Sequence, residues 1–393
     1  MLEFNPKRVQ GQVRNFERCM ASYSFNEPFS RYLTQFYKSN KQMGSSDRRM
    51  NSRYCYHFFR LGKALSTLSL QERLVVAEFL CESESAAVAL FQPDWISRIS
   101  DDLLSKIAFI SSIYGDFLGD VFPLLEDLSP SINKEEFIIS HFVQPDLYIR
   151  LQKGKEDVVK KELDRQGVQY QIIAPQTLAL ANGTNLQQFR KIDGAYEVQD
   201  LSSQQTLDGV EFAPKSSWWD CCAASGGKSL LLLDKEPDIK LMVSDIRLSI
   251  LRNLDERFER AGVKTYFRKK ILDLSTPVEN LMSGEAFDGI LLDAPCSGSG
   301  TWGRTPEMLS KIEKSDIDAY ADLQKNIASN VIPYLKVGKP LVYITCSVYA
   351  QENEEVVNQL AAEFGLEVEE MRTIAGYTKK ADSMFVARLK KSS

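Results

Sequence analysis

The chain has 393 residues, which is enough for two or three domains with apolar cores of their own. Hydrophobic residues make up 44% of the sequence and charged residues 26%, and no run of about 18 apolar residues is present. This composition indicates a soluble globular protein and excludes one that spans a membrane. The net charge of −5 counts against a uniformly basic nucleic-acid-binding protein, so any phosphate-binding surface must be local.

Residues 1–7 lack the apolar segment and the cleavage site of a secretory signal, so we expect a cytoplasmic protein. The seven cysteines form no Cys-x-x-Cys pair, and His57 and His141 are the only histidines, so we expect no metal site. An odd number of cysteines also argues against a disulfide framework.

Residues 1–135 are predicted to form an all-helical domain. Residues 70–80 repeat apolar side chains at spacings of three and four, which is typical of an amphipathic helix. Residues 1–53 carry ten lysines and arginines against four acids, which makes a docking face for phosphate groups possible there. A second basic cluster, at 150–165, has six basic residues against four acids, and a solvated helix face explains it equally well. The Ser- and Pro-containing residues 128–131 predict a linker or a helix–helix turn.

Residues 136–205 are predicted to form a small α+β subdomain, with strands at 146–151, 170–174 and 177–181 and a helix at 154–166. From 206 to 393 strands and helices alternate, which predicts an α/β domain with a mainly parallel sheet covered by helices on both faces. The strand candidates are 217–221, 240–245, 264–268, 287–293 and 340–345.

The first strand of this α/β domain runs into a loop of small residues, 220–228, before a helix. Small residues allow the backbone to approach a ligand, and the helix N-terminus offers free N–H groups. Asp245 ends the next strand, where an acid can accept hydrogen bonds from ribose hydroxyls, so the pattern suggests an adenosine-containing cofactor. Tight packing alone explains Gly226 and Gly227 equally well, and Asp273 is either a further cofactor contact or a helix N-cap.

Two cysteines follow strands at the same edge of the predicted sheet. Asp293 and Cys296 come after the strand at 287–293, and Cys346 comes after the strand at 340–345. If the two strands are neighbours, their ends lie roughly 5 Å apart and both thiols can reach one small ring. We expect Cys19, Cys55, Cys81 and, less clearly, Cys221 and Cys222 to be buried apolar residues, which is the usual state of a free cysteine.

Two thiols and an acid suit methyl transfer to C5 of cytosine. Carbon C5 becomes nucleophilic only after a thiolate adds to C6, and the C5 proton must then leave before the thiol can be eliminated. Asp293 is placed to hydrogen-bond the ring edge near N3 and to stabilise the charge that develops during addition.

These residues resemble the RsmB/Nop/Sun family of RNA 5-methylcytosine methyltransferases. The resemblance covers roughly the last half of the chain, and the segments that carry it are 220–228, Asp245, Asp273, 293–298, 304–307, 345–347 and 352–355, with 198–200 and 385–390. In this chain Ser225 stands where the family usually has proline, Ile250 stands where a basic residue is common, and residues 382–385 read Asp-Ser-Met-Phe in place of the usual Asp-Gly-Phe-Phe.

By this resemblance Cys346 is the nucleophile and Cys296 helps to release the product. The residues that would hold S-adenosylmethionine are Cys222, Ala223, Ala224, Ser225, Gly226, Gly227, Lys228, Asp245, Asp273 and Asp293. The resemblance further implies a Rossmann-like methyltransferase sheet at 206–393 and an RNA-recognition-like subdomain at 136–205. A faint likeness of residues 44–49 suggests a NusB-like, RNA-binding domain at 1–135, and this favours rRNA over tRNA.

Two other functions stay open. A DNA cytosine-C5 methyltransferase would use a Pro-Cys nucleophile, Cys296, but would give no role to Cys346. A ribosome-assembly factor would bind RNA without catalysis and keep a vestigial cofactor site. For the RNA methyltransferase, the target base must be unstacked to meet both thiols, so we expect a single-stranded or opened RNA as the partner.

Overall fold

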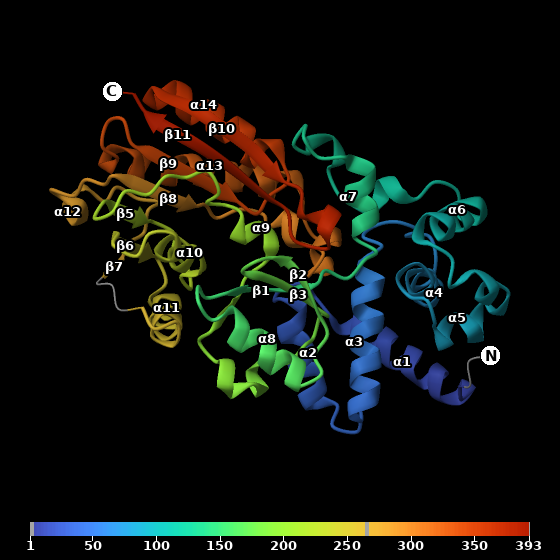
Figure 1. Cartoon of the computed structure of the whole chain (residues 1–393). Helices are drawn as coiled ribbons and strands as arrows, with labels where there is room; N and C mark the ends of the chain where they lie inside the picture. The colour runs from blue at the N-terminus through green and yellow to red at the C-terminus, as the bar shows by residue number, and fades with distance from the viewer. Residues whose placement is uncertain (1–3, 264–266, 393) are drawn as a thin grey trace. The chain divides into compact units, whose positions relative to one another are not determined.

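The computed structural model describes residues 4–263 and 267–392. The chain divides into two compact units, each continuous in space but not in sequence (Figure 1). The helical unit holds Met1–Glu126, Lys134–Gln144 and Trp302–Glu313, and the sheet unit holds Asp127–Asn133, Pro145–Thr301 and Lys314–Ser393. The domain boundaries expected at 135/136 and 205/206 stay a prediction.

The helical unit confirms the all-helical N-terminal region expected from the sequence. Two of its helices begin at residues suited to that position: the Asn5 side chain accepts a hydrogen bond from the backbone of Arg8, and Ser69 and Glu72 cap each other reciprocally. The helices are α1 (Pro6–Ser22), α2 (Phe29–Ser39), α3 (Ser45–Phe59), α4 (Leu70–Cys81), α5 (Ala86–Phe91), α6 (Leu103–Tyr114) and α7 (Lys134–Ser140).

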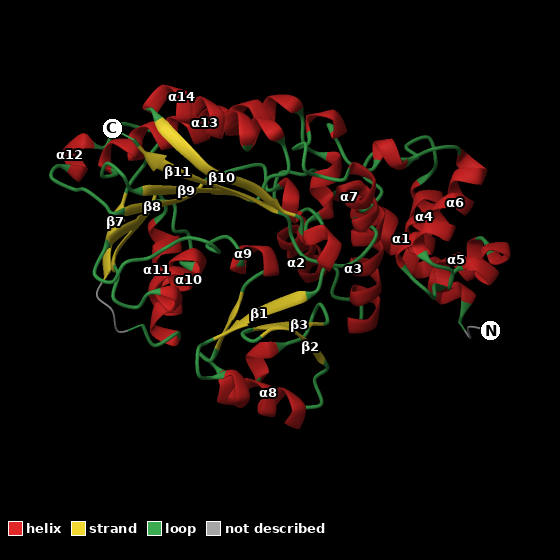
Figure 2. Ribbon diagram, turned by 45° about the horizontal axis from the view of Figure 1, so that its top comes forward, coloured by secondary structure: helices red, strands yellow, loops and turns green. Residues whose placement is uncertain are grey.

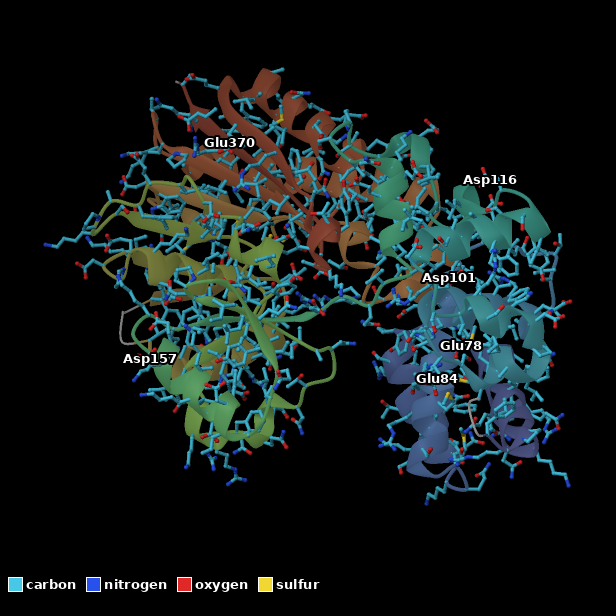
Figure 3. All side chains as sticks on the ribbon, turned by 45° about the vertical axis from the view of Figure 1, so that its right-hand side comes forward. Glu78, Glu84, Asp101, Asp116, Asp157 and Glu370 are labelled. Atoms are coloured by element: carbon cyan, nitrogen blue, oxygen red, sulfur yellow. The ribbon has the colours of Figure 1, made fainter. Side chains whose placement is uncertain are left out.

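The amphipathic pattern predicted for residues 70–80 is wrong, although the helix itself forms. All side chains of α4 from Leu74 to Leu80 are buried, because α1, α3, α5 and α6 pack around it. Glu78 lies in the middle of this stretch, among the helices of the unit (Figure 3). Its two carboxylate oxygens lie 2.6 Å from Arg53 and 2.6 Å from His57, which is how a buried charge is accommodated here.

The small α+β subdomain lies within the sheet unit. Its antiparallel sheet has the order β2-β3-β1-β4, with β1 (Leu147–Leu151), β2 (Tyr170–Ala174), β3 (Thr177–Leu180) and β4 (Tyr196–Val198). Helix α8 (Glu156–Arg165) packs Val159 and Leu163 against the inward residues of β1 and β3, and α9 (Leu201–Gln204) follows β4. The strands and the helix predicted between 146 and 181 are confirmed.

The large sheet has seven strands in the order β10-β11-β9-β8-β5-β6-β7. The five strands from β9 to β7 are parallel, and β11 and β10 add an antiparallel edge. The predicted α/β, Rossmann-like class is confirmed. The strands are β5 (Ser217–Asp220), β6 (Lys240–Asp245), β7 (Phe267–Ile271), β8 (Gly289–Asp293), β9 (Pro340–Thr345), β10 (Leu366–Ile374) and β11 (Met384–Lys391). Of the strand expected at 264–268, residues 264–266 lie outside the described residues.

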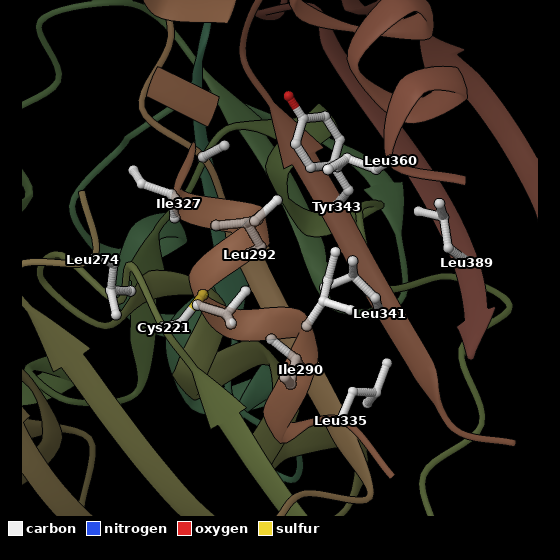
Figure 4. Packing of buried hydrophobic residues seen from close by; sticks show 14 of the residues in the cluster. Cys221, Leu274, Ile290, Leu292, Ile327, Leu335, Leu341, Tyr343, Leu360 and Leu389 are labelled. Carbon is white, nitrogen blue, oxygen red and sulfur yellow. The ribbon is translucent and has the colours of Figure 1, made fainter. Parts of the chain in front are cut away.

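Helices cover both faces of this sheet (Figure 2). One face packs against α10 (Gly227–Lys235) and α11 (Leu248–Arg260), and the other packs against α13 (Lys314–Val331) and α14 (Glu354–Phe364), with the short α12 (Glu279–Met282) beside it. Side chains alternate along a strand, so Trp218 of β5 enters the first core and Trp219 enters the second. Figure 4 shows Ile290, Leu292, Leu341 and Tyr343 of β8 and β9 in the second core.

The parallel strands bring the carboxyl ends of β5, β6, β8 and β9 to one edge, where ligands bind in open α/β sheets. Among the described residues, no helix is both long and apolar enough to cross a membrane.

Candidate active site

A cleft of about 600 Å³ lies at the carboxyl edge of the large sheet. Seven of the residues predicted for the site line it: Cys222, Ala224, Asp245, Asp273, Asp293, Cys296 and Cys346. The other predicted residues, Ala223, Ser225, Gly226, Gly227 and Lys228, are not part of its lining. They lie in the turn behind it and at the start of α10. The structure therefore gathers both cysteines and all three predicted acids around one space.

The loop between β5 and α10 makes a tight turn against α11. Gly226 has a φ of +82°, and a Cβ atom there would lie 2.8 Å from the ring of Phe258, so only glycine fits. Ala224 also has a positive φ of +47°, and its backbone N–H donates to the Asp245 carboxylate at 3.2 Å. Asp245 thus anchors the turn that exposes Cys222 and Ala224 to the cleft.

Asp245 and Asp273, two of the acids that line the cleft, have different local partners. Asp245 accepts hydrogen bonds from the backbone N–H and the guanidinium of Arg247, at 2.9 and 3.1 Å. Asp273 accepts from the backbone N–H of Ser275 at 3.0 Å and from its hydroxyl at 2.5 Å, which closes a turn after β7. No described helix begins at Asp273, since α12 starts at Glu279, so the N-cap alternative for Asp273 is wrong.

Lys228 forms an ion pair with Asp293 at the end of β8, with Nζ 3.0 Å from the carboxylate. Burial lowers the pKa of Lys228, but the charge of Asp293 and the hydrogen bond outweigh this effect and leave that pKa above its ordinary value. Lys228 is therefore charged at neutral pH and fixes the direction of the Asp293 carboxylate.

Cys296 and Cys346 lie side by side on the wall of the cleft. Strands β8 and β9 are neighbours, as expected, and the two sulfur atoms lie 3.3 Å apart. The hydrogen bond to the sulfur of Cys346, together with burial, raises the pKa of the Cys296 thiol well above its ordinary value. Cys296 therefore keeps its proton, and a hydrogen bond joins the two sulfur atoms.

A buried carboxyl group holds the two cysteine loops together. Glu352 accepts hydrogen bonds from the backbone N–H of Ser297 at 2.7 Å, from the Ser297 hydroxyl at 2.5 Å, from the Ser347 hydroxyl, and from Gln324 at 3.2 Å. Burial raises the pKa of Glu352, and these hydrogen bonds offset only part of that effect. One side chain thus connects the loop after β8, the loop after β9 and α13.

The backbone adds a second tie between these loops. The N–H of Gly300 donates to the carbonyl of Cys346 at 2.9 Å, and a Cβ atom on Gly300 would lie 2.1 Å from the carbonyl of Ser383. Asn353 accepts from the hydroxyl of Thr345 and donates to the carbonyl of Ser347. The positions of both sulfur atoms are therefore determined by contacts beneath the cleft.

A family model described as 16S rRNA methyltransferase RsmB/F matches residues 209–390. Residues 209–390 are therefore similar to RsmB/F methyltransferases. Two relatives are named ribosomal RNA small subunit methyltransferase B. The one from Xylella fastidiosa is 37% identical over 161 residues, which is 41% of this chain and 38% of that protein. The one from Shewanella oneidensis is 34% identical over 171 residues, 44% of this chain and 39% of that protein. The matched part thus spans about two fifths of the length of these relatives.

Solved structures share the fold of the matched segment and of the chain as a whole. The crystal structure of PH0851 superposes with a TM-score of 0.71 at 19% identity and covers 99% of this chain and 100% of its own. NSun6 from Pyrococcus horikoshii, solved with SFG, has a TM-score of 0.58 at 18% identity and covers 68% of this chain and 97% of its own.

The sequence predicted no role for Arg247, which contacts Asp245, or for Glu352, which contacts Ser297 directly after Cys296. Glu352 lies in one of the segments that carry the family resemblance. The sequence feature that could have indicated its role is a glutamate there with no basic residue nearby in sequence. Arg247 carried no signal beyond its place two residues after Asp245. Among residues 4–263 and 267–392, no group of three or more histidine, cysteine or acidic side chains is arranged to hold a metal ion.

Proposed function

We propose that this chain transfers a methyl group from S-adenosylmethionine to C5 of a cytosine in RNA through a covalent bond between Cys346 and C6. The observation that carries the proposal is the pair of thiols, 3.3 Å apart, on the wall of a cleft that also presents three carboxylates. The names of the RsmB/F relatives favour rRNA over tRNA as the substrate.

The cleft fits S-adenosylmethionine. Its volume of about 600 Å³ lies within the range of small-molecule sites, and small side chains line the side nearest the loop after β5. Asp245 and Asp273 offer carboxylate acceptors for hydroxyl groups, as the donor's ribose requires. The NSun6 relative was solved with SFG, an analogue of this cofactor. When bound, S-adenosylmethionine supplies an electrophilic methyl group on a sulfonium.

Addition begins at Cys346. Its sulfur lies 3.3 Å from the sulfur of Cys296, close enough for the Cys296 thiol to donate a hydrogen bond to it during the reaction. Attack on C6 forms a carbon–sulfur bond and moves the electrons of the C5–C6 double bond onto C5, which then takes the methyl group. Asp293, held by Lys228, is positioned to hydrogen-bond the ring edge near N3 while charge develops there.

Elimination falls to Cys296. Once the sulfur of Cys346 is bonded to carbon, it no longer acts as the acceptor that raises the pKa of Cys296 most, so Cys296 can release its own proton to solvent. Its thiolate removes the C5 proton, the C–H electrons restore the C5–C6 double bond, and the bond from C6 to Cys346 breaks. The products are 5-methylcytosine, the thiolate of Cys346, which leaves with the electron pair of the carbon–sulfur bond, and the thiol of Cys296, which now carries the former C5 proton.

We propose further that the RNA is single-stranded or opened at the target, because the base must leave its stack to reach both thiols. The basic N-terminal residues supply a docking surface: Arg8, Arg14 and Arg18 of α1 line a hollow of about 490 Å³ in the helical unit, with Asp47 as its one acid. Arginines in this arrangement suit phosphate oxygens.

The test is methyl transfer by the purified chain. Incubation with methyl-labelled S-adenosylmethionine and unmodified rRNA should yield labelled 5-methylcytosine by nucleoside mass spectrometry, and Cys346→Ala should yield none. A label on another base, or on no base although the protein binds the cofactor, would contradict the proposal, and the second result would favour the non-catalytic assembly factor. A preference for DNA would favour the alternative cytosine-C5 enzyme.

A further inference from the structure

One arginine joins the cofactor loop to the small α+β subdomain. Arg257, on α11, donates through Nη1 to the hydroxyl of Ser225 at 3.2 Å, and through Nε to the carboxylate of Glu197 at 2.6 Å. A third bond runs from Nη2 to the carbonyl of Val198 at 3.4 Å. The planar guanidinium thus contacts the turn behind the cleft and strand β4 at the same time.

The contact with the cofactor loop is close on both sides of the turn. A Cβ atom on Gly227 would lie 3.3 Å from Nη1 of Arg257, so the first residue of α10 packs directly on the guanidinium. A separate hollow of about 760 Å³ lies beside the small sheet, and Arg257 lines it. Of the predicted cofactor residues, only Ser225 lines this hollow. Arg257 therefore contacts the loop from outside the cleft.

The contact with the subdomain is buried. Glu197 is 1% exposed, and its cross-strand partner on β1 is Arg150, which pairs with Asp234 of α10. Arg150 also donates to Gln199 at 2.8 Å. Polar side chains of the small sheet thus reach both α10 and α11, and Arg257 is the member that touches the loop itself.

We propose that Arg257 is a positioning residue through which the small α+β subdomain sets the conformation of the cofactor loop and hence the affinity for S-adenosylmethionine. The inference rests on the proposed function only in taking this cleft as the cofactor site. It predicts that a change at Glu197, on a strand that does not line the cleft, weakens cofactor binding.

The experiment is calorimetric titration with S-adenosylhomocysteine of the full chain and three variants. Ser225→Ala removes one hydrogen bond to a charged donor and should weaken binding about fivefold. Arg257→Lys keeps the charge but cannot bridge both partners, so it should weaken binding to a similar extent. Glu197→Gln should weaken binding about threefold. Glu256→Gln, an exposed neighbour on α11 that lines the same hollow, is the matched control and should bind as the unmodified chain does.

The double variant Ser225→Ala/Arg257→Lys should bind S-adenosylhomocysteine no more weakly than either single variant, because both changes remove the same contact. In steady-state assays the KM for S-adenosylmethionine should rise while kcat and the KM for RNA stay unchanged. Thermal melts check that each variant folds. If Glu197→Gln does not fold, hydrogen exchange is measured for Arg257→Lys instead, and residues 222–228 should exchange faster than in the unmodified chain.

Equal binding by all variants would overturn the inference and leave the proposed function intact. Weaker binding for Ser225→Ala but not for Glu197→Gln would also overturn it, because the loop would then be held by α11 alone. Failure of the unmodified chain to bind S-adenosylhomocysteine would overturn the proposed function and this inference with it.

Discussion

Each unit of the molecule buries a glutamate, and the two carboxyl groups lie in opposite surroundings. In the helical unit, burial alone would raise the pKa of Glu78, but the hydrogen bonds and charges of His57 and Arg53 outweigh it and bring that pKa to about 2. In the sheet unit, Glu352 contacts hydroxyls, an amide and a backbone N–H, and no cation pairs with it among the residues that the structure describes; burial raises its pKa. Glu78 is therefore a permanent charge that holds helices together.

Glu352 has a different use. It orders two loops without bringing a positive charge to the sulfur atoms, and its own negative charge helps to raise the pKa of Cys296. The comparison teaches that a buried carboxyl group can serve stability or site geometry, and that its hydrogen-bond partners decide which.

The largest effect expected from this contrast follows from Glu352→Ala. Removing an acceptor of four hydrogen bonds leaves Ser297, Ser347 and Gln324 without their partner beneath both cysteines. We expect the free energy of unfolding to fall by about 4 kcal/mol and single-turnover methyl transfer to fall at least about 100-fold. Urea unfolding and a rapid-quench assay measure the two quantities.

The matched control is Glu355→Gln, an exposed acid three residues on, which should change neither quantity. Full activity of Glu352→Ala would show that the cysteine loops keep their geometry without the carboxyl group. This result would contradict the proposal that Glu352 serves site geometry while Glu78 serves stability.

The second effect concerns Asp220, the last residue of β5. Burial, offset in part by the hydrogen bond from Ser229, raises the pKa of Asp220 to about 7. Because the folded chain holds this proton more tightly than the unfolded chain, its contribution to stability is present below about pH 4 and is lost as the pH rises through 7, by about 4 kcal/mol. Asp220→Asn should flatten the decline of unfolding free energy between pH 5 and 8 in urea titrations, and an unchanged slope would contradict the assignment.

Glu78 should make the free energy of unfolding change with pH in the opposite direction. Its pKa is depressed in the folded state, so its contribution is present above about pH 4.5 and is lost as the pH falls toward 2, by about 3 kcal/mol. Unfolding of the helical unit followed by circular dichroism from pH 6 to 2.5 should be steeper in the unmodified chain than in Glu78→Gln. Equal slopes would mean that Arg53 and His57 do not stabilise the charge.

The smallest effect concerns exposed charges. Replacing Arg8, Arg14 and Arg18 together by glutamine should weaken RNA binding about tenfold and reduce the slope of log affinity against log salt by about 2 to 3. Filter binding at several salt concentrations measures both, with Arg31→Gln as the control, since Arg31 is exposed on α2 outside that hollow. If the slope of log affinity against log salt did not change, the helical unit would not contact the RNA through these arginines.

The sequence predicted the parts of the site that depend on local periodicity. The apolar pattern of a buried strand shows in the sequence where the strand ends. Asp245, Asp293, Cys296 and Cys346 could therefore be predicted to lie at one edge of a parallel sheet. The order of the strands then brought the two thiols together.

What could not be predicted depends on contacts distant in sequence. The residues next to Glu352 and Arg257 in sequence do not show that each side chain connects distant segments. Glu352 has one partner nearby in sequence, Ser347, but its other partners and Glu197, the partner of Arg257, lie 28 to 60 residues away. The burial of α4 on all sides arises from four other helices, and residues 302–313 join the helical unit although the sheet unit surrounds them in sequence. Helical periodicity carries no information about such neighbours.

The central claim is that the two sulfur atoms act in sequence on one cytosine. Denaturing electrophoresis of each cysteine variant after incubation with RNA and S-adenosylmethionine tests it most directly, because a covalent complex survives denaturation. We predict that Cys346→Ala forms no complex and that Cys296→Ala accumulates one. A complex that requires Cys296 and persists in Cys346→Ala would contradict the account.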